Sequence, residues 1–95
     1  MNDTKLIRAE AILAEMAQIF FAENDASPWG KKLSSLAQNK TMHPDDFRSQ
    51  IKRFYGGMGS LNDIVLIAPN GKVDREANVR FSKLKNELYQ LIFQT

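Results

Sequence analysis

The stretch from residue 3 to residue 23 constrains the fold most, because it holds neither glycine nor proline and repeats apolar residues with a helical period. Residues three or four positions apart lie on one face of a helix. In this stretch that face carries Leu6, Ala9, Leu13, Met16 and Phe20, widened by Ile12 and Ile19. The sequence therefore predicts one long helix over residues 3–23 that packs into a core.

A second line of mostly apolar residues runs along the opposite side of this predicted helix. Its members follow a spacing like that of a coiled-coil seam: Ile7, Ala11, Ala14, Gln18 and Phe21. A helix that is apolar on all sides is normally buried, so one interpretation is a central helix surrounded by the others. The alternative is a seam left open for a partner or a second copy. Exposure of Ile7 and Phe21 would favour that alternative.

Proline and glycine divide the middle of the chain into two shorter helices. Ser27 can cap a helix, and Pro28 follows at a position where its missing N–H costs nothing. Pro44 opens the next helix in the same way. Gly56-Gly57 ends it, because glycine readily takes the left-handed conformation that terminates helices. We predict helices over residues 28–38 and 44–55.

Residues 64–73 predict a small β-structure before the last helix. The β-branched and apolar run at 64–67 is followed by Pro69-Asn70-Gly71, a turn sequence, and by a second short strand near residues 72–73. A last helix then extends from Asp74 or Glu76 to Phe93. The predicted fold is mainly α: a single domain over residues 1–95, with about four helices in a small bundle and a short β-ribbon between the third and last helices.

Composition excludes several classes of function. No cysteine is present, which excludes disulfides, a thiolate nucleophile and cysteine zinc sites. The one histidine, His43, precedes Pro44 and suits a helix cap better than a general base. No apolar run approaches the ~18–20 residues of a membrane span, and the first residues lack the layout of a signal peptide. We therefore expect a cytoplasmic protein that is not an enzyme and has no cofactor or metal.

Charge is distributed unevenly along the chain. Acidic residues exceed basic ones by three in residues 1–30, whereas basic residues exceed acidic ones by four in residues 31–60. The basic third could bind RNA or DNA phosphates, with Tyr55 nearby for stacking on a base. The cations of that alternative are Lys31, Lys32, Lys40, Arg48, Lys52 and Arg53.

The central block of the sequence resembles the signature of a small bacterial family of single-domain proteins. The block is Arg53-Phe54-Tyr55-Gly56-Gly57-Met58-Gly59-Ser60-Leu61-Asn62-Asp63-Ile64-Val65-Leu66. A tryptophan near the start of the second helix, Trp29, and a last helix containing Phe81-Ser82-Lys83-Leu84-Lys85-Asn86-Glu87-Leu88-Tyr89 complete the resemblance. Proteins of this type are similar to immunity proteins of contact-dependent inhibition systems, which protect a bacterium from toxins delivered by neighbouring cells.

The resemblance implies a function as a toxin inhibitor. The expected partner is a cognate protein toxin, bound one-to-one, and such toxins are often nucleases with basic clefts. Carboxylates on an inhibitor would complement those cations and speed association. The predicted contacts are Glu10, Glu15, Glu23 and Asp25, with Asp45 and Asp46 as a second cluster. Two alternatives stay open: the nucleic-acid-binding regulator, and a homodimeric helical scaffold that pairs through the Ile7–Phe21 seam.

Overall fold

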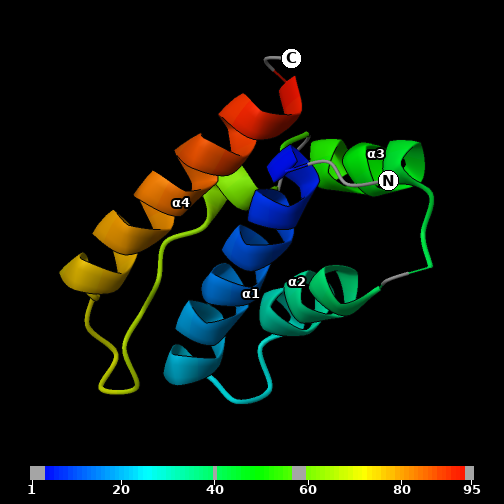
Figure 1. Cartoon of the computed structure of the whole chain (residues 1–95). Helices are drawn as coiled ribbons and strands as arrows, with labels where there is room; N and C mark the ends of the chain where they lie inside the picture. The colour runs from blue at the N-terminus through cyan, green and yellow to red at the C-terminus, as the bar shows by residue number, and fades with distance from the viewer. Residues whose placement is uncertain (1–3, 40, 57–59, 94–95) are drawn as a thin grey trace.

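The computed structural model describes residues 4–39, 41–56 and 60–93 and forms an elongated helical bundle of about 43 × 23 × 23 Å (Figure 1). The prediction of a mainly helical bundle is confirmed. Asp3, Lys40 and the glycine-rich residues 57–59 of the signature lie outside the described residues. The elements in chain order are α1 (Thr4–Glu23), α2 (Pro28–Gln38), α3 (Pro44–Phe54), the 3₁₀ turn η1 (Leu61–Asp63) and α4 (Arg75–Phe93).

Helix α1 is the centre of the bundle. It packs most extensively against α2 and next against α4, while α3 lies across the end of the bundle and contacts α4 (Figure 1). Every residue of the predicted core face of α1 is buried, and Phe20 meets Phe81 of α4 edge to face with ring centroids 5.4 Å apart. The core is completed by buried residues of α2, α3 and α4, chiefly Leu33, Ile51, Phe81 and Leu88.

The starts of α2 and α3 are built as the sequence indicates. Ser27 Oγ accepts a hydrogen bond from Gly30 N at 3.1 Å, and Pro28 occupies the first turn of α2. His43 Nδ1 accepts from Asp45 N at 3.1 Å, so the imidazole side chain caps α3. These side chains satisfy backbone N–H groups that have no partner within the helix.

The predicted β-ribbon is wrong. Among the described residues there is no strand, and only an isolated antiparallel bridge joins Ile67 to Val73. The turn itself forms: Gly71 has a φ of +84°, and its N–H donates to Ala68 O at 2.8 Å. Two backbone hydrogen bonds flank the bridge, from Ala68 N to Lys72 O at 2.8 Å and from Asp74 N to Leu66 O at 3.1 Å, and the first side of the expected ribbon also bonds to a side chain of α4.

That side chain is Asn78, which holds residues 64–68 against the helix. Its Oδ1 accepts from Leu66 N at 2.9 Å, and its Nδ2 donates to Leu66 O at 3.0 Å and to Asp74 O at 2.7 Å. Leu66 is thereby buried in the core. Asn78 thus adds side-chain hydrogen bonds to Leu66 at a place where the backbone pairing with residues 72–74 is limited to one bridge.

Candidate functional site

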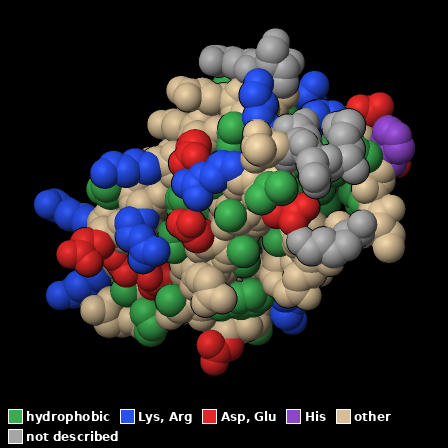
Figure 2. Space-filling model, viewed as in Figure 1, with side chains coloured by type: hydrophobic (Ala, Val, Ile, Leu, Met, Phe, Trp, Pro, Cys, Tyr) green, Lys and Arg blue, Asp and Glu red, His purple; other side chains and the backbone are tan. Residues whose placement is uncertain are grey.

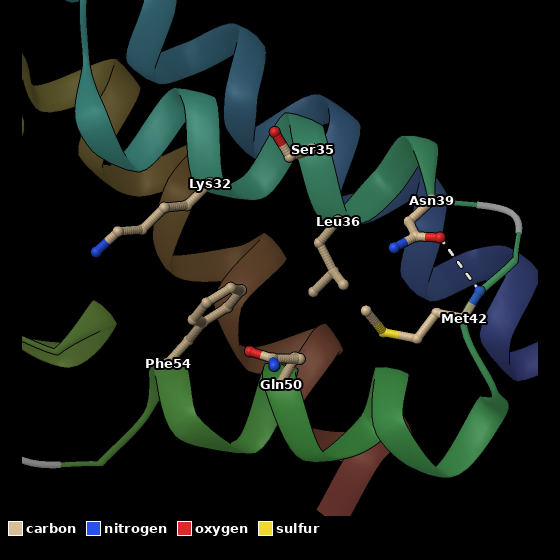
Figure 3. A pocket seen from close by; sticks show the side chains of 7 residues that line it. All are labelled: Lys32, Ser35, Leu36, Asn39, Met42, Gln50 and Phe54. Atoms are coloured by element: carbon tan, nitrogen blue, oxygen red, sulfur yellow. Dashed lines mark hydrogen bonds between the residues drawn. The ribbon is translucent and has the colours of Figure 1, made fainter.

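An open groove lies between α2 and α3 on the described surface. It has a volume of about 450 Å³ and receives residues from α2, from the α2–α3 loop and from α3. The lining residues are Lys32, Ser35, Leu36, Asn39, Met42, Gln50 and Phe54. In Figure 3 the side chains of Leu36, Met42, Gln50 and Phe54 project into the space that separates the two helices.

The floor of the groove is apolar. Leu36 is buried, and Met42 and Phe54 are half-buried against the core. Trp29 meets Phe54 of the floor edge to face with ring centroids 5.4 Å apart. Polar side chains and Lys32 form the rim, so the groove suits an apolar group that carries polar or anionic neighbours.

The loop between the helices fixes the other end of the groove. Asn39 Oδ1 accepts hydrogen bonds from Thr41 N at 3.2 Å and from Thr41 Oγ1 at 3.1 Å. It also accepts one from Met42 N at 3.1 Å (Figure 3). Asparagine commonly stabilises turns in this way. These bonds hold Met42 over the space between α2 and α3, so the groove is shaped before any partner arrives.

One cation is positioned at the mouth of the groove. Lys32 Nζ lies 5.0 Å from the centre of the Trp29 ring, within the range of a cation–π contact. Of the residues that line the groove, Lys32 is the one that carries a charge. An anionic group of a partner would therefore meet a positive charge beside an aromatic surface.

The predicted carboxylates do not form one contact surface. Glu10, Glu15 and Glu23 lie on different sides of α1, and Glu10 and Glu23 are half-buried. Asp25 is exposed in the α1–α2 turn, at the opposite end of the bundle from α3 (Figure 1). Asp45 and Asp46 are exposed in the first turn of α3. Asp25 is thus far from Asp45 and Asp46.

Several of these carboxylates already have partners within the chain. Glu15 lies 3.8 Å from Arg8, which also forms a two-pronged ion pair with Glu87 of α4 at 2.6 and 2.9 Å. The hydrogen bond to Arg8 lowers the pKa of Glu87 and raises the pKa of Arg8. Asp45 lies 3.5 Å from Arg48. Part of the acidic surface therefore stabilises helix starts and helix contacts.

Glu23 is coupled to another carboxyl group. It lies at the end of α1 beside Asp74, whose Oδ1 caps α4 by accepting from Ala77 N at 3.0 Å. Two ionised carboxylates cannot donate a hydrogen bond to each other. Glu23 Oε2 is buried and has no hydrogen-bond partner among the described residues. A hydrogen bond with Asp74, followed by desolvation, raises the pKa of Glu23. The Ala77 N–H and Glu23 lower the pKa of Asp74.

The predicted seam on α1 divides into two parts. Ile7 is 58% exposed, and Ala11, Ala14 and Gln18 are also exposed. Phe21 is half-buried and packs on α2, where a Cβ added to Gly30 would lie only 2.8 Å from its ring. Figure 2 shows apolar side chains between charged groups over α1 on the face in view. Phe21 thus belongs to the fold.

The predicted basic residues lie on two helices. Lys31 and Lys32 are exposed on α2, and Arg48, Lys52 and Arg53 lie on α3. Tyr55 donates a hydrogen bond to Lys85 O at 2.7 Å, and burial, together with Tyr89, raises the pKa of Tyr55. Its role is therefore chiefly structural.

Beside Tyr55 lies an exposed aromatic pair that sequence reasoning missed. Tyr89 and Phe93 are 42% and 37% exposed, and their rings stack with centroids 4.4 Å apart. Lys52 Nζ lies 5.5 Å from the centre of the Phe93 ring. The four-residue spacing of the pair on the last predicted helix was the signal that could have identified it.

Within 4–39, 41–56 and 60–93, His, Asp and Glu side chains nowhere gather in groups of three or more that could hold a metal ion. In the same residues, none of the helices has the length and apolar character needed to cross a membrane.

Comparison with known proteins identifies one family. The model of a family described as "Domain of unknown function (DUF6966)" matches residues 22–75, more than half of the chain. The matched region contains every residue that lines the groove, whereas the exposed residues of the α1 seam precede it. No curated protein and no solved structure matches the chain significantly.

Proposed function

We propose that this chain, which belongs to the DUF6966 family of domains of unknown function, is a non-enzymatic protein-binding domain that neutralises a bacterial toxin in the cytoplasm. It binds one toxin molecule and covers the toxin's active site. The observation that carries the proposal is the preformed groove between α2 and α3, with its apolar floor and polar rim. The class of partner rests on the resemblance of the central block to immunity proteins.

The groove suits a side chain that protrudes from a protein surface. Its volume falls within the ~300–1,000 Å³ of typical ligand sites, but it is an open trough between two helices. Apolar anchors that fill such a site contribute most of the binding energy in protein interfaces. We propose that an aromatic or aliphatic side chain of the toxin packs on Leu36, Met42 and Phe54, while a neighbouring carboxylate meets Lys32.

This arrangement changes the expected contact chemistry. The carboxylates predicted to face a basic cleft are dispersed, and several are paired within the chain. Asp45 and Asp46 lie on the same helix as Phe54 and can contribute at the edge of an interface centred on the groove. We therefore propose that shape and apolar contact supply most of the affinity, and that these two carboxylates supply charge complementarity.

Rescue of growth tests the proposal. The chain is immobilised, proteins of the source organism that it retains are identified, and each is produced in a host cell with and without the chain. We expect one retained protein to stop growth and the chain to restore it. Gln50→Trp, which fills the groove, should abolish rescue, whereas Ser49→Trp on the outward side of α3 should not. Full rescue by Gln50→Trp would refute the groove as the contact site.

The exposed aromatic pair favours a second candidate function, binding of single-stranded RNA. Stacking of a base on an aromatic ring contributes ~1–3 kcal/mol, and Lys52 lies beside Phe93 to meet a phosphate. This candidate predicts that a fluorescent oligouridine binds at low salt with an affinity that falls steeply as salt rises. Tyr89→Ala should weaken that binding about tenfold or more. Absence of binding at low salt would exclude this function.

A further inference from the structure

The groove between α2 and α3 has two chemically different ends. Figure 3 shows the two helices running in opposite directions, so Lys32 and Phe54 lie at one end of the groove and Asn39 and Met42 at the other. Lys32 and the C-cap Asn39 are about 10 Å apart along the axis of α2, because a helix rises ~1.5 Å per residue. A ligand that reaches both ends therefore spans about two helical turns.

The end at Lys32 is positive. Lys32 is exposed, and its Nζ lies beside the Trp29 ring, which contacts Phe54. Arg53 precedes Phe54 in the last turn of α3 and is exposed as well. Among the described residues that line the groove there is no carboxylate. A carboxylate of a partner is therefore stabilised at this end.

The end at Met42 is negative. Asp46 lies in the first turn of α3, one turn before Gln50, so it shares the side of α3 that faces the groove. Asp45 pairs with Arg48 at 3.5 Å, whereas the exposed Asp46 stays on the side of Gln50. The apolar floor lies between the two charged ends. The groove is therefore complementary to a ligand with a carboxylate at one end, an apolar group in the middle and a cation at the other end.

Given the protein-binding function proposed above for this groove, we propose that it takes an amphipathic helix of the partner with a carboxylate and a cation about seven residues apart on one face. A helix advances about 10 Å over that distance, so the two charges reach Lys32 and Asp46 together. An apolar residue midway between them then packs on Leu36, Met42 and Phe54. Recognition of a helix in a groove commonly depends on side chains at this spacing.

A helix of a partner suits the groove better than the α4 helix of a second copy. The exposed side of α4 has the required spacing in Glu76, Val79 and Lys83. Arg80 follows Glu76 by one turn on the same side, so a second copy would bring a cation against Lys32. A partner helix without that cation avoids the repulsion.

Titration with a helical peptide, followed by the amide resonances of the chain in NMR spectra, tests the proposal. The probe is an alanine-based peptide of ~16 residues, long enough to be helical, with a glutamate, a phenylalanine one turn later and a lysine two turns after the glutamate. The amide resonances of Leu36 and Gln50 should shift on binding. Lys32→Glu replaces an attraction by a repulsion and should weaken binding about tenfold. Lys31→Glu is the matched control and should leave binding unchanged, because the neighbouring Lys31 is exposed but does not line the groove.

Exchange of charge on the probe gives a readout that a damaged fold cannot imitate. A second peptide carries lysine in place of the glutamate. It should bind the unaltered chain about tenfold more weakly than the first peptide, yet bind Lys32→Glu more tightly than the first peptide does. Asp46→Asn should weaken binding of the first peptide severalfold, and more than Asp45→Asn does.

Four results of these titrations would overturn the proposal. They are absence of binding at millimolar peptide, equal binding of the two peptides to the unaltered chain, equal losses from Lys31→Glu and Lys32→Glu, and no effect of Asp46→Asn. Self-association of the chain that Lys32→Glu abolishes would show that a second copy occupies the groove, and it would overturn the proposal too.

The growth-rescue assay separates the charged helix from the function on which it rests. We expect both Gln50→Trp and Lys32→Glu to reduce rescue, and Lys31→Glu to rescue fully. Reduced rescue by Gln50→Trp with full rescue by Lys32→Glu would leave the groove as the contact site and overturn the charged helix as its occupant. Full rescue by Gln50→Trp would refute the function of the groove itself.

Discussion

Replacing Asn78 by alanine should destabilise the chain by about 2 kcal/mol. The substitution removes three hydrogen bonds, two to the backbone of Leu66 and one to Asp74 O. Each bond contributes ~0.5–1.5 kcal/mol net. Alanine returns about 0.6 kcal/mol through its higher helix propensity, and the freed backbone groups are partly hydrated because the site is only part-buried. The net cost then lies near the middle of the range.

Urea unfolding followed by helical circular dichroism and by the fluorescence of Trp29 measures this cost. Asn86→Ala is the matched control, because Asn86 is exposed two turns further along α4. That control should be neutral or slightly stabilising. Asn78→Asp keeps the acceptor for Leu66 N but turns a carboxylate toward two carbonyl oxygens, so it should cost at least as much as alanine. The reasoning is refuted if Asn78→Ala and Asn86→Ala differ by less than about 0.5 kcal/mol.

Three further perturbations test the packing and electrostatics. Gly30→Ala places a methyl group against the Phe21 ring and should lower the free energy of unfolding by about 1–2 kcal/mol. In a Phe21→Ala background the same substitution should stabilise the chain. A stabilising effect in both backgrounds would contradict the close contact between Gly30 and Phe21. The raised pKa of Glu23 contributes stability that is present in acid and is lost as pH rises above the ordinary carboxyl range. Glu23→Gln should therefore raise the urea midpoint of unfolding at pH 7 and have little effect on it near pH 4. An unchanged midpoint at pH 7 would argue against the coupling of Glu23 to Asp74. Ser27→Ala removes the buried cap of α2 and should cost about 1 kcal/mol in thermal or urea unfolding, whereas no loss would mean that another group satisfies Gly30 N.

The helices were predictable because their signals are local. The core face of α1 follows from the spacing of apolar residues within one segment. Ser27 and His43 each begin a helix by accepting a hydrogen bond from a backbone N–H two or three residues further along the chain. The turn ending at Gly71 was predictable for the same reason. Such features depend on a few neighbouring residues and not on the rest of the fold.

The β-ribbon could not be judged locally. The run at 64–67 has the composition of a strand, but whether it pairs with another strand depends on what lies beside it. Asn78, twelve residues beyond Leu66, bonds both backbone groups of Leu66, and the pairing with residues 72–74 stays limited to one bridge. Local pattern and long-range contact therefore favoured different structures at this position, and the contact with α4 prevailed.

The candidate site was less predictable than the fold. The groove depends on the separation of α2 and α3, which Asn39 and Met42 set through the loop. Acidic residues in the sequence do not reveal which of them have partners, as Glu15 and Glu23 illustrate. A contact surface selected to fit a partner has no motif of its own, so it emerges only from the packed structure.

Site-specific photocrosslinking in the source cells tests the central claim most directly. A benzophenone side chain is placed at position 50, inside the groove, or at position 49, on the outward side of α3. Binding in the groove predicts one adduct of defined mass from position 50, identifiable as a single protein, with little or none from position 49. Equal adducts from both positions, or none from position 50, would contradict the assignment of the groove as the partner-binding site.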